Sequence, residues 1–410
     1  MNFLNEIAFR YPDAVSFAPG RPFEGYFDTT QVHDYLRRFE QYLKEDKGYS
    51  DEQVHRTLLQ YGRTKGIIHE LIAEHLHVDE GISIDPESVV VTVGCQEAMF
   101  IVLRALRSGE RDVVLVVSPS YVGLTGAARL VDMPVLEVAG GPQGVDLDDL
   151  ETTVKEARAR GLRPRACYLV PDFSNPAGTS LDLETRHAVL DLAEREDFLL
   201  LEDNPYGHFS ADGERLPTLK SLDTRRRVVY LGSFAKTGLP GARIGYALAD
   251  QSVRGIDGRV GLLADQLSKI KSMLTVNTSP IAQAVIGGKL LMHGGSLLKA
   301  NKREISVYRE NLACLLKGLS RLFPSGGDSG VSWNVPRGGF FLVVNLPFPA
   351  DDKLLETSAH EYGVLWTPMR YFSAKREVAN QIRLSYSLVT PEQIDLGLER
   401  LAALVADRLT

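Results

Sequence analysis

The stretch SFAKTGLPGARIG, residues 233–245, lies immediately beyond the short apolar run Val228–Leu231. A lysine just after a buried strand is unusual, because burial penalises its charge. Desolvation lowers the pKa of such a lysine, and the uncharged amine of Lys236 can form a Schiff base with an aldehyde. Ser233 and Arg243 could hold a phosphate through a hydroxyl and a forked guanidinium. An exposed lysine in a glycine-rich turn is the plainer alternative, which the whole string in its strand–loop context disfavours.

Short β-branched runs alternate with helical patterns ahead of this stretch. The predicted strands are Val89–Val93, Val113–Val117, Ala166–Val170, Phe198–Leu201 and Val228–Leu231, and the predicted helices are Glu97–Arg107, Gly123–Leu130, Leu147–Arg160 and Leu183–Arg195. This alternation is typical of an α/β fold with a mostly parallel sheet covered on both faces. Because ligands of such sheets bind outside the carboxyl ends of the strands, the residues after these runs should meet in one region. They include Gly94, Tyr121, Asn175, Asp203 and Lys236.

Three parts are expected along the chain: an N-terminal arm (1–45), a large α/β domain (46–290) and a smaller α+β domain (291–410). The arm is rich in Pro, Gly and aromatic residues and should be extended to about Arg38. The apolar pattern of Asp51–Leu76 predicts helix. In the smaller domain we expect a polar helix from about Leu290 through Tyr308, strands near Phe340–Asn345 and Ile382–Ser385, and a final helix from Pro391.

Composition excludes several classes of protein. The 410 residues carry a net charge of −7, which argues against a nucleic-acid-binding surface. The three cysteines, Cys95, Cys167 and Cys314, form neither a metal-ligand pair nor an even disulfide set, so we expect no metal and a reducing compartment. Neither a signal peptide nor a membrane-spanning run is recognisable, and a cytoplasmic location is expected. The G-x-x-x-x-G-K-[ST] string of phosphate-binding NTPases is absent from the sequence.

The string at 233–245 resembles the lysine-and-arginine signature of fold-type I pyridoxal-5′-phosphate (PLP) aminotransferases, classes I and II. Asn175-Pro176-Ala177-Gly178, Asp203 and Tyr206 within Glu202–Tyr206, and Arg383 within Gln381–Tyr386 are similar to other motifs of this family. The resemblance spans Ser16 to Ser387 and implies a large PLP-binding domain with a seven-stranded-type sheet. Within the family the chain resembles the aminoadipate/kynurenine-type and valine–pyruvate-type group, and a branch that makes nonproteinogenic amino acids, such as arylglycines or enduracididine, for antibiotics.

The resemblance implies a role for each residue that would hold the cofactor. Lys236 would carry PLP, and Asp203 would pair with the pyridine nitrogen and keep it protonated. Asn175 and Tyr206 would bond the phenolic oxygen, and Tyr121 would stack on the ring. The phosphate would lie on Ser233, Arg243 and the backbone N–H groups of Gly94-Cys95-Gln96, where a thiol replaces the small hydroxyl residue of many relatives. Helix cap, turn and core positions are the plain alternatives for Asp203, Asn175 and the two tyrosines.

The substrate and a second subunit are also implied. Arg383 would clamp the substrate carboxylate, although a surface strand arginine is the plain alternative. Gly20 and Arg21 lie in Ser16–Pro22, which is similar to the loop that covers the substrate. Tyr61 lies in Gln60–Gly66, which resembles the segment that reaches a neighbouring subunit's phosphate, so a homodimer with shared sites is expected.

The implied reaction is ping-pong transamination between an α-amino acid and a 2-oxo acid, with Lys236 as the general base. Another PLP reaction on the same fold, such as β-elimination, decarboxylation or oxidase chemistry, is the first alternative, because the cofactor motifs are shared. A transcription regulator that fuses a winged helix to this fold is a weaker one, since we expect no basic DNA-reading domain ahead of the arm.

Overall fold

The computed structural model describes residues 10–141, 143–255, 258–324, 329–373 and 378–409. Its centre is a seven-stranded sheet, in which β8 runs antiparallel to both of its neighbours while the remaining pairs are parallel. The strands, in spatial order, are β2 (Val89–Val93), β8 (Ile244–Leu248), β7 (Val228–Ser233), β6 (Leu199–Asp203), β5 (Arg163–Leu169), β3 (Asp112–Ser118) and β4 (Val135–Ala139). The α/β class and the mostly parallel sheet are confirmed.

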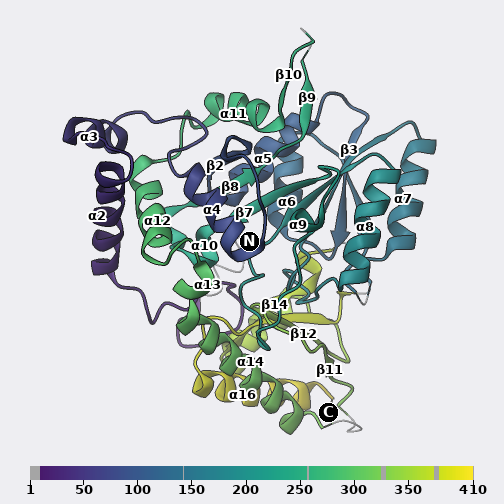
Figure 1. Ribbon diagram of the computed structural model, residues 1–410. Coiled ribbons are helices and arrows are strands. Elements are labelled where there is room, and N and C mark those ends of the chain that lie inside the picture. Colours follow the sequence, from purple (N-terminus) through teal and green to yellow (C-terminus); the bar gives the residue numbers. More distant parts are fainter. Residues whose placement is uncertain (1–9, 142, 256–257, 325–328, 374–377, 410) are drawn as a thin grey trace.

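Helices cover both faces of this sheet, because successive side chains of its strands point to opposite faces. Val90 packs on one side with α5 (Gly94–Leu106), α6 (Val122–Leu130) and α11 (Leu263–Leu274). Val89 and Val91 pack on the other side with α4 (His69–Glu80) and α12 (Pro280–Met292). Further along that second face lie α7 (Leu147–Ala159) and α8 (Leu183–Arg195) (Figure 1). The apolar strands are therefore buried on both sides.

The five predicted strands and the four helices between them are all present, within a few residues of their expected ends. The predicted helix over Asp51–Leu76 is two helices, α3 (Asp51–Leu59) and α4. The break contains Gly66, whose φ is +99° and where a Cβ would overlap the side chain of Val91, so helical backbone cannot continue there. The polar helix expected from Leu290 instead begins at Lys302, as α14 (Lys302–Leu322).

The prediction of an extended segment as far as Arg38 is wrong from Thr29 onward. Asp28 caps the helix α2 (Thr29–Glu45) by accepting a hydrogen bond from the backbone N–H of Thr30 at 2.8 Å. Tyr35, Phe39 and Leu43 form the buried stripe of α2, which packs on α12. The composition of the preceding Pro- and Gly-rich residues does not predict this helix, because it carries no information about the amphipathic pattern that follows them.

The smaller sheet has the order β11 (Ser332–Trp333), β12 (Phe341–Asn345), β15 (Gln381–Ser385) and β14 (Thr367–Pro368), and α14 and α16 (Pro391–Leu409) pack beside it. The strand β1 (Val15–Ser16) pairs with β13 (Val364–Leu365), so the chain's first described residues lie against this small domain. The remaining elements are short: α9 (Leu219–Leu222), α10 (Phe234–Thr237), α13 (Leu297–Ala300), α15 (Asp352–Thr357), the hairpin β9 (Ser252–Arg254) and β10 (Val260–Leu262), and single turns at 86–88, 240–242, 358–362 and 369–371.

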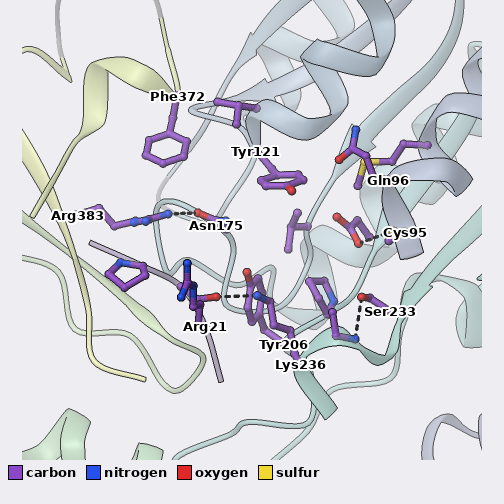
Figure 2. A pocket seen from close by; sticks show the side chains of 18 of the residues that line it. Arg21, Cys95, Gln96, Tyr121, Asn175, Tyr206, Ser233, Lys236, Phe372 and Arg383 are labelled. Atoms are coloured by element: carbon purple, nitrogen blue, oxygen red, sulfur yellow. Dashed lines mark hydrogen bonds between the residues drawn. The ribbon is translucent and has the colours of Figure 1, made fainter. Parts of the chain in front are cut away.

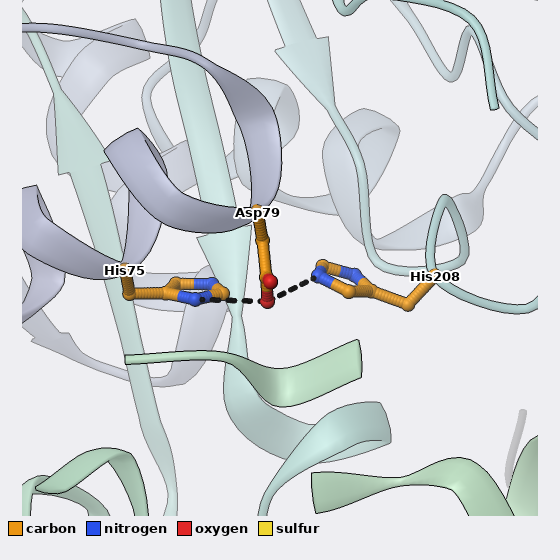
Figure 3. Close-up of side chains that lie close together, drawn as sticks. All are labelled: His75, Asp79 and His208. Carbon is orange, nitrogen blue, oxygen red and sulfur yellow. Dashed lines mark ion pairs between the residues drawn. The ribbon is translucent and has the colours of Figure 1, made fainter. Parts of the chain in front are cut away.

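A buried polar cluster ties α4 to α13 and to the loop after β6. The carboxylate of Asp79 lies 3.3 Å from Nδ1 of His75 and 3.5 Å from Nε2 of His208 (Figure 3). It also accepts hydrogen bonds from the Ser296 hydroxyl and the Leu297 N–H, each at 2.7 Å. His75 Nδ1 faces the carbonyl oxygen of Gly295 at 2.9 Å, so this nitrogen carries a proton and has no lone pair for a metal. The cluster therefore has a structural role, in which it holds α4, α13 and the loop after β6 together.

Among the described residues, no helix is both long and apolar enough to cross a bilayer.

Candidate active site

A cavity of about 480 Å³ opens where the carboxyl ends of the large sheet meet the small domain (Figure 2). Most of the predicted site residues line it, namely Gly20, Arg21, Cys95, Gln96, Tyr121, Asn175, Asp203, Tyr206, Ser233, Lys236, Arg243 and Arg383. They come from segments up to 365 residues apart, as the bond between Arg383 and the Ala18 carbonyl illustrates. The topology of the sheet brings them together, as expected for strands whose ends share one edge.

Lys236 lies in the short helix α10, which begins directly after β7. Its Nζ donates a hydrogen bond to the carbonyl oxygen of Gly20 at 2.6 Å. Burial, helped by the positive charges of Arg383 and Arg243, lowers the pKa of Lys236 to about 8. Part of the lysine population is therefore uncharged near neutral pH, as a nucleophilic amine requires.

Asp203 ends β6 and is 4% exposed. One carboxylate oxygen accepts a hydrogen bond from the hydroxyl of Tyr168 at 2.7 Å, and the other faces the thiol of Cys95 at 3.6 Å. Burial raises the pKa of Asp203 to about 6, against the opposing effects of Tyr168, Cys95 and the Lys236 charge. Because no helix begins after Asp203, where residues 204–210 form bends, turns and an isolated bridge, the helix-cap alternative is wrong.

Ser233, Arg243 and the first turn of α5 converge at another part of the cavity. Gly94 begins α5 with a φ of +71°, and a Cβ at this position would overlap the guanidinium of Arg243. The backbone conformation and the close approach of the arginine both favour glycine at this position. A guanidinium, a hydroxyl and the N-terminus of a helix together suit a phosphate.

Arg383 extends from β15 toward Asn175, whose side-chain oxygen it bonds at 2.6 Å. Its guanidinium also donates to the carbonyl oxygen of Ala18 at 2.7 Å and lies between the rings of Phe341 and Phe372, at 4.3 and 4.9 Å. Burial lowers the pKa of Arg383 to about 10. Among the described residues, only neutral groups bond this cation, and its Nε has no partner. A buried guanidinium in this state suits a carboxylate ligand.

Two residues of this region were not predicted as part of the site. Tyr168 counted only as one of the strand residues, although a tyrosine in an otherwise apolar buried strand signals a hydroxyl that needs a partner. Phe372 follows a single turn between β14 and β15, and the sequence around it holds no comparable signal.

Tyr61 lies apart from the cavity, in the segment between α3 and α4. Its side chain is 81% exposed. Leu59 and Met273 are also large apolar side chains exposed to solvent, at 75% and 83%. The segment between α3 and α4 packs beside the start of α12: a Cβ added to Gly62 would contact Asn277 and Pro280.

The family model of class I and II aminotransferases matches residues 30–401. The chain belongs to this family. It is 56% identical over 409 residues to the (S)-3,5-dihydroxyphenylglycine transaminase of Amycolatopsis orientalis, a match that covers 100% of this chain and 92% of the relative. It is 30% identical over 393 residues to the 2-aminoadipate transaminase of Thermus thermophilus, covering 95% and 89% of the two chains. The kynurenine aminotransferase of Pyrococcus horikoshii, solved in complex with PMP, superposes with a TM-score of 0.83 at 29% identity and covers 99% and 94%.

These similarities confirm the expected cofactor and class of reaction. The protein is a PLP-dependent aminotransferase that acts on amino acids and 2-oxo acids. The cavity fits the cofactor: it contains an amine of lowered pKa, a buried carboxylate and a cationic cradle for a phosphate. The resemblance to the aminoadipate/kynurenine-type group and to an arylglycine branch is likewise confirmed.

Proposed function

We propose that this aminotransferase interconverts a hydroxylated arylglycine and the corresponding arylglyoxylate, with a second amino acid and 2-oxo acid pair completing the cycle. The observation that carries this proposal is the 56% identity, over the whole chain, to a 3,5-dihydroxyphenylglycine transaminase. The cavity supports it with the aromatic rings of Tyr121 and Phe372, which offer apolar surface to a ring joined directly to Cα. Arg21 and Gln96 add polar groups suited to phenolic hydroxyls.

In this proposal each side chain has a distinct task. Bound PLP supplies an electron sink for the negative charge that develops at the substrate's Cα. Lys236 takes the Cα proton and returns it, while Arg383 clamps the substrate carboxylate. Asp203 stays ionised beside the ring nitrogen. Asn175, which is already bonded to Arg383, and Tyr206 donate hydrogen bonds to the phenolic oxygen of the cofactor.

The test is a half-reaction screen in which the purified holoenzyme meets one amino donor at a time. The donors are 3,5-dihydroxyphenylglycine, 4-hydroxyphenylglycine, 2-aminoadipate, kynurenine and aspartate, and the conversion of the cofactor to its amine form is followed spectroscopically. We expect the arylglycines to exceed the others in kcat/KM by about 10-fold or more, since pocket fit of this kind contributes about 1–3 kcal/mol. Higher kcat/KM for 2-aminoadipate would overturn the substrate class, and release of ammonia or CO2 would overturn the reaction.

We also propose that the active unit is a homodimer in which Tyr61 completes the phosphate site of the partner subunit. Supporting this proposal, Tyr61 is a large exposed side chain in a segment that borders further exposed apolar residues, Val276 (50%) and Ile281 (48%). Several large apolar side chains exposed on neighbouring segments are typical of an interaction surface. The hydroxyl of Tyr61 would add a neutral donor to the dianionic phosphate of the cofactor in the other subunit, which already faces Arg243 and Ser233 there.

Mixing two impaired variants should restore activity if the sites are shared. Tyr61→Ala weakens phosphate binding and Lys236→Ala removes the base, so a mixed dimer has one site with both lesions and one with neither. After random subunit exchange we expect roughly a quarter of wild-type activity at limiting PLP, since half the dimers are mixed and each has one intact site. Exchange is verified with a mass tag on one variant. Proven exchange without recovery would mean that each site belongs to one chain.

A further inference from the structure

Two side chains beside Asp203 have no part in the roles described so far: the hydroxyl of Tyr168 and the thiol of Cys95. We propose that both are positioning residues, which fix the Asp203 carboxylate and keep the proton that it shares with the cofactor on the ring nitrogen. The inference rests on the proposed role of Asp203 toward that nitrogen.

Tyr168 holds the carboxylate from within the sheet. It lies on β5, which pairs in parallel with β6, and its side chain is 1% exposed. The surrounding residues belong to the apolar cluster that includes Val114, Ala166 and Leu201. A phenylalanine would fill this space equally well, so the hydroxyl matters through its 2.7 Å bond to Asp203.

Cys95 approaches the carboxylate from the opposite side. It is the second residue of α5, and its Sγ lies 3.6 Å from the oxygen that Tyr168 leaves free (the contact is dashed at Cys95 in Figure 2). Burial, followed by the negative charge of Asp203, raises the pKa of the Cys95 thiol well above its usual value. The sulfur therefore keeps its proton and can donate it to a hydrogen bond. The side chain is thus engaged with Asp203, and only its backbone N–H is left to the phosphate.

The hydrogen bonds from Tyr168 and Cys95 affect the basicity of Asp203. Against the effect of burial, Tyr168 from β5, Cys95 from α5 and Lys236 from α10 each lower the pKa of Asp203. Besides burial, the charge of Asp203 in turn raises the pKa of Tyr121, before α6, and of Tyr206, after β6. Of these groups, Tyr168 and Cys95 donate hydrogen bonds to the Asp203 carboxylate. A donor to a carboxylate stabilises the charged form and lowers its proton affinity. A proton shared with the ring nitrogen then stays on the nitrogen, and a protonated ring withdraws electrons more strongly.

The test reads the protonation of the ring nitrogen directly. Holoenzyme is loaded with PLP that carries ¹⁵N in the pyridine ring, and its nitrogen chemical shift is recorded from pH 6 to pH 9. Because a hydrogen bond to a charged group corresponds to about one to two pKa units, Tyr168→Phe should lower the ratio of protonated to neutral nitrogen by about 10- to 100-fold. Cys95→Ala should shift the ratio in the same direction by about 3-fold, because a thiol is a weak donor. Cys95→Ser keeps a donor and should remain close to wild type.

Matched controls separate this effect from a general loss of packing. Tyr230→Phe removes a buried hydroxyl from β7, and Cys167→Ala removes a buried thiol from β5. Both side chains pack on the face of the sheet opposite to that of Tyr168. Both controls should leave the nitrogen shift unchanged. If folded Tyr168→Phe and Cys95→Ala variants also match wild type, the inference is overturned. Asp203→Ala tests the role of Asp203 separately from those of Tyr168 and Cys95: if this variant keeps a protonated nitrogen, the proposed role of Asp203 fails as well.

Discussion

Replacing Lys236 by alanine should reduce kcat for transamination by about four orders of magnitude or more, since both the nucleophile and the general base are lost. The same variant should yield no covalent adduct after borohydride reduction, whereas mass spectrometry of the wild type should place the reduced cofactor on Lys236. Lys236→Arg should be equally inactive, because a guanidinium stays protonated. Lys269→Ala, at an exposed lysine of α11, serves as the control. A reduced adduct on any other lysine would refute the assignment.

The pH dependence of cofactor capture follows from the same residue. In protein freed of PLP, the pKa of Lys236 is lowered to about 8, mainly by burial and then by Arg383 and Arg243. The amine attacks the cofactor's aldehyde only when uncharged. The rate at which the protein captures added PLP should therefore rise with pH up to about 8 and level off above it, as measured by stopped-flow absorbance.

Replacing Asp203 by alanine should leave PLP bound through Lys236, Ser233 and Arg243, while kcat falls by about three orders of magnitude because the ring loses its ionic partner. The measurement pairs steady-state kinetics with the cofactor content after dialysis. Glu202→Gln is the matched control, because Glu202 is the neighbouring buried carboxyl, bonds the backbone N–H groups of Leu219 and Lys220, and does not line the cavity. Its stability can fall, but its kcat should hardly change. Near-normal kcat in Asp203→Ala would leave the carboxylate with a structural role alone.

Local patterns determined the class of the fold and the identity of the reactive lysine. The runs from Val89 to Leu231 are apolar, β-branched and separated by helical periodicity, so their strands could be predicted without knowledge of their neighbours. The rule that ligands bind at the carboxyl ends of parallel strands then selected Lys236, Asp203 and Asn175 from many residues of the same types. These inferences need only short-range information, which a sequence carries directly.

Short-range information also explains what was missed. The strands β4 and β8 of the large sheet were not predicted. Only the short helix α10 and a single turn separate β8 from β7, so the expected alternation of strands with long helices fails there. The helix α2 was overlooked for a related reason, since its stability comes from burying Phe39 against α12, more than 240 residues later. Tertiary packing, more than local propensity, decides such elements.

Only the tertiary structure decided how the site residues are paired. The Arg383 guanidinium meets Asn175 and Phe372, and the thiol of Cys95 faces Asp203, across separations that no pattern in the chain encodes. In the sequence Tyr168 is one more residue of an apolar strand, and only the structure shows that its hydroxyl holds the carboxylate of Asp203. The physical reason is that hydrogen bonds and pKa shifts depend on distance and burial in three dimensions, whereas a sequence determines which groups are available and roughly which edge of the sheet they reach.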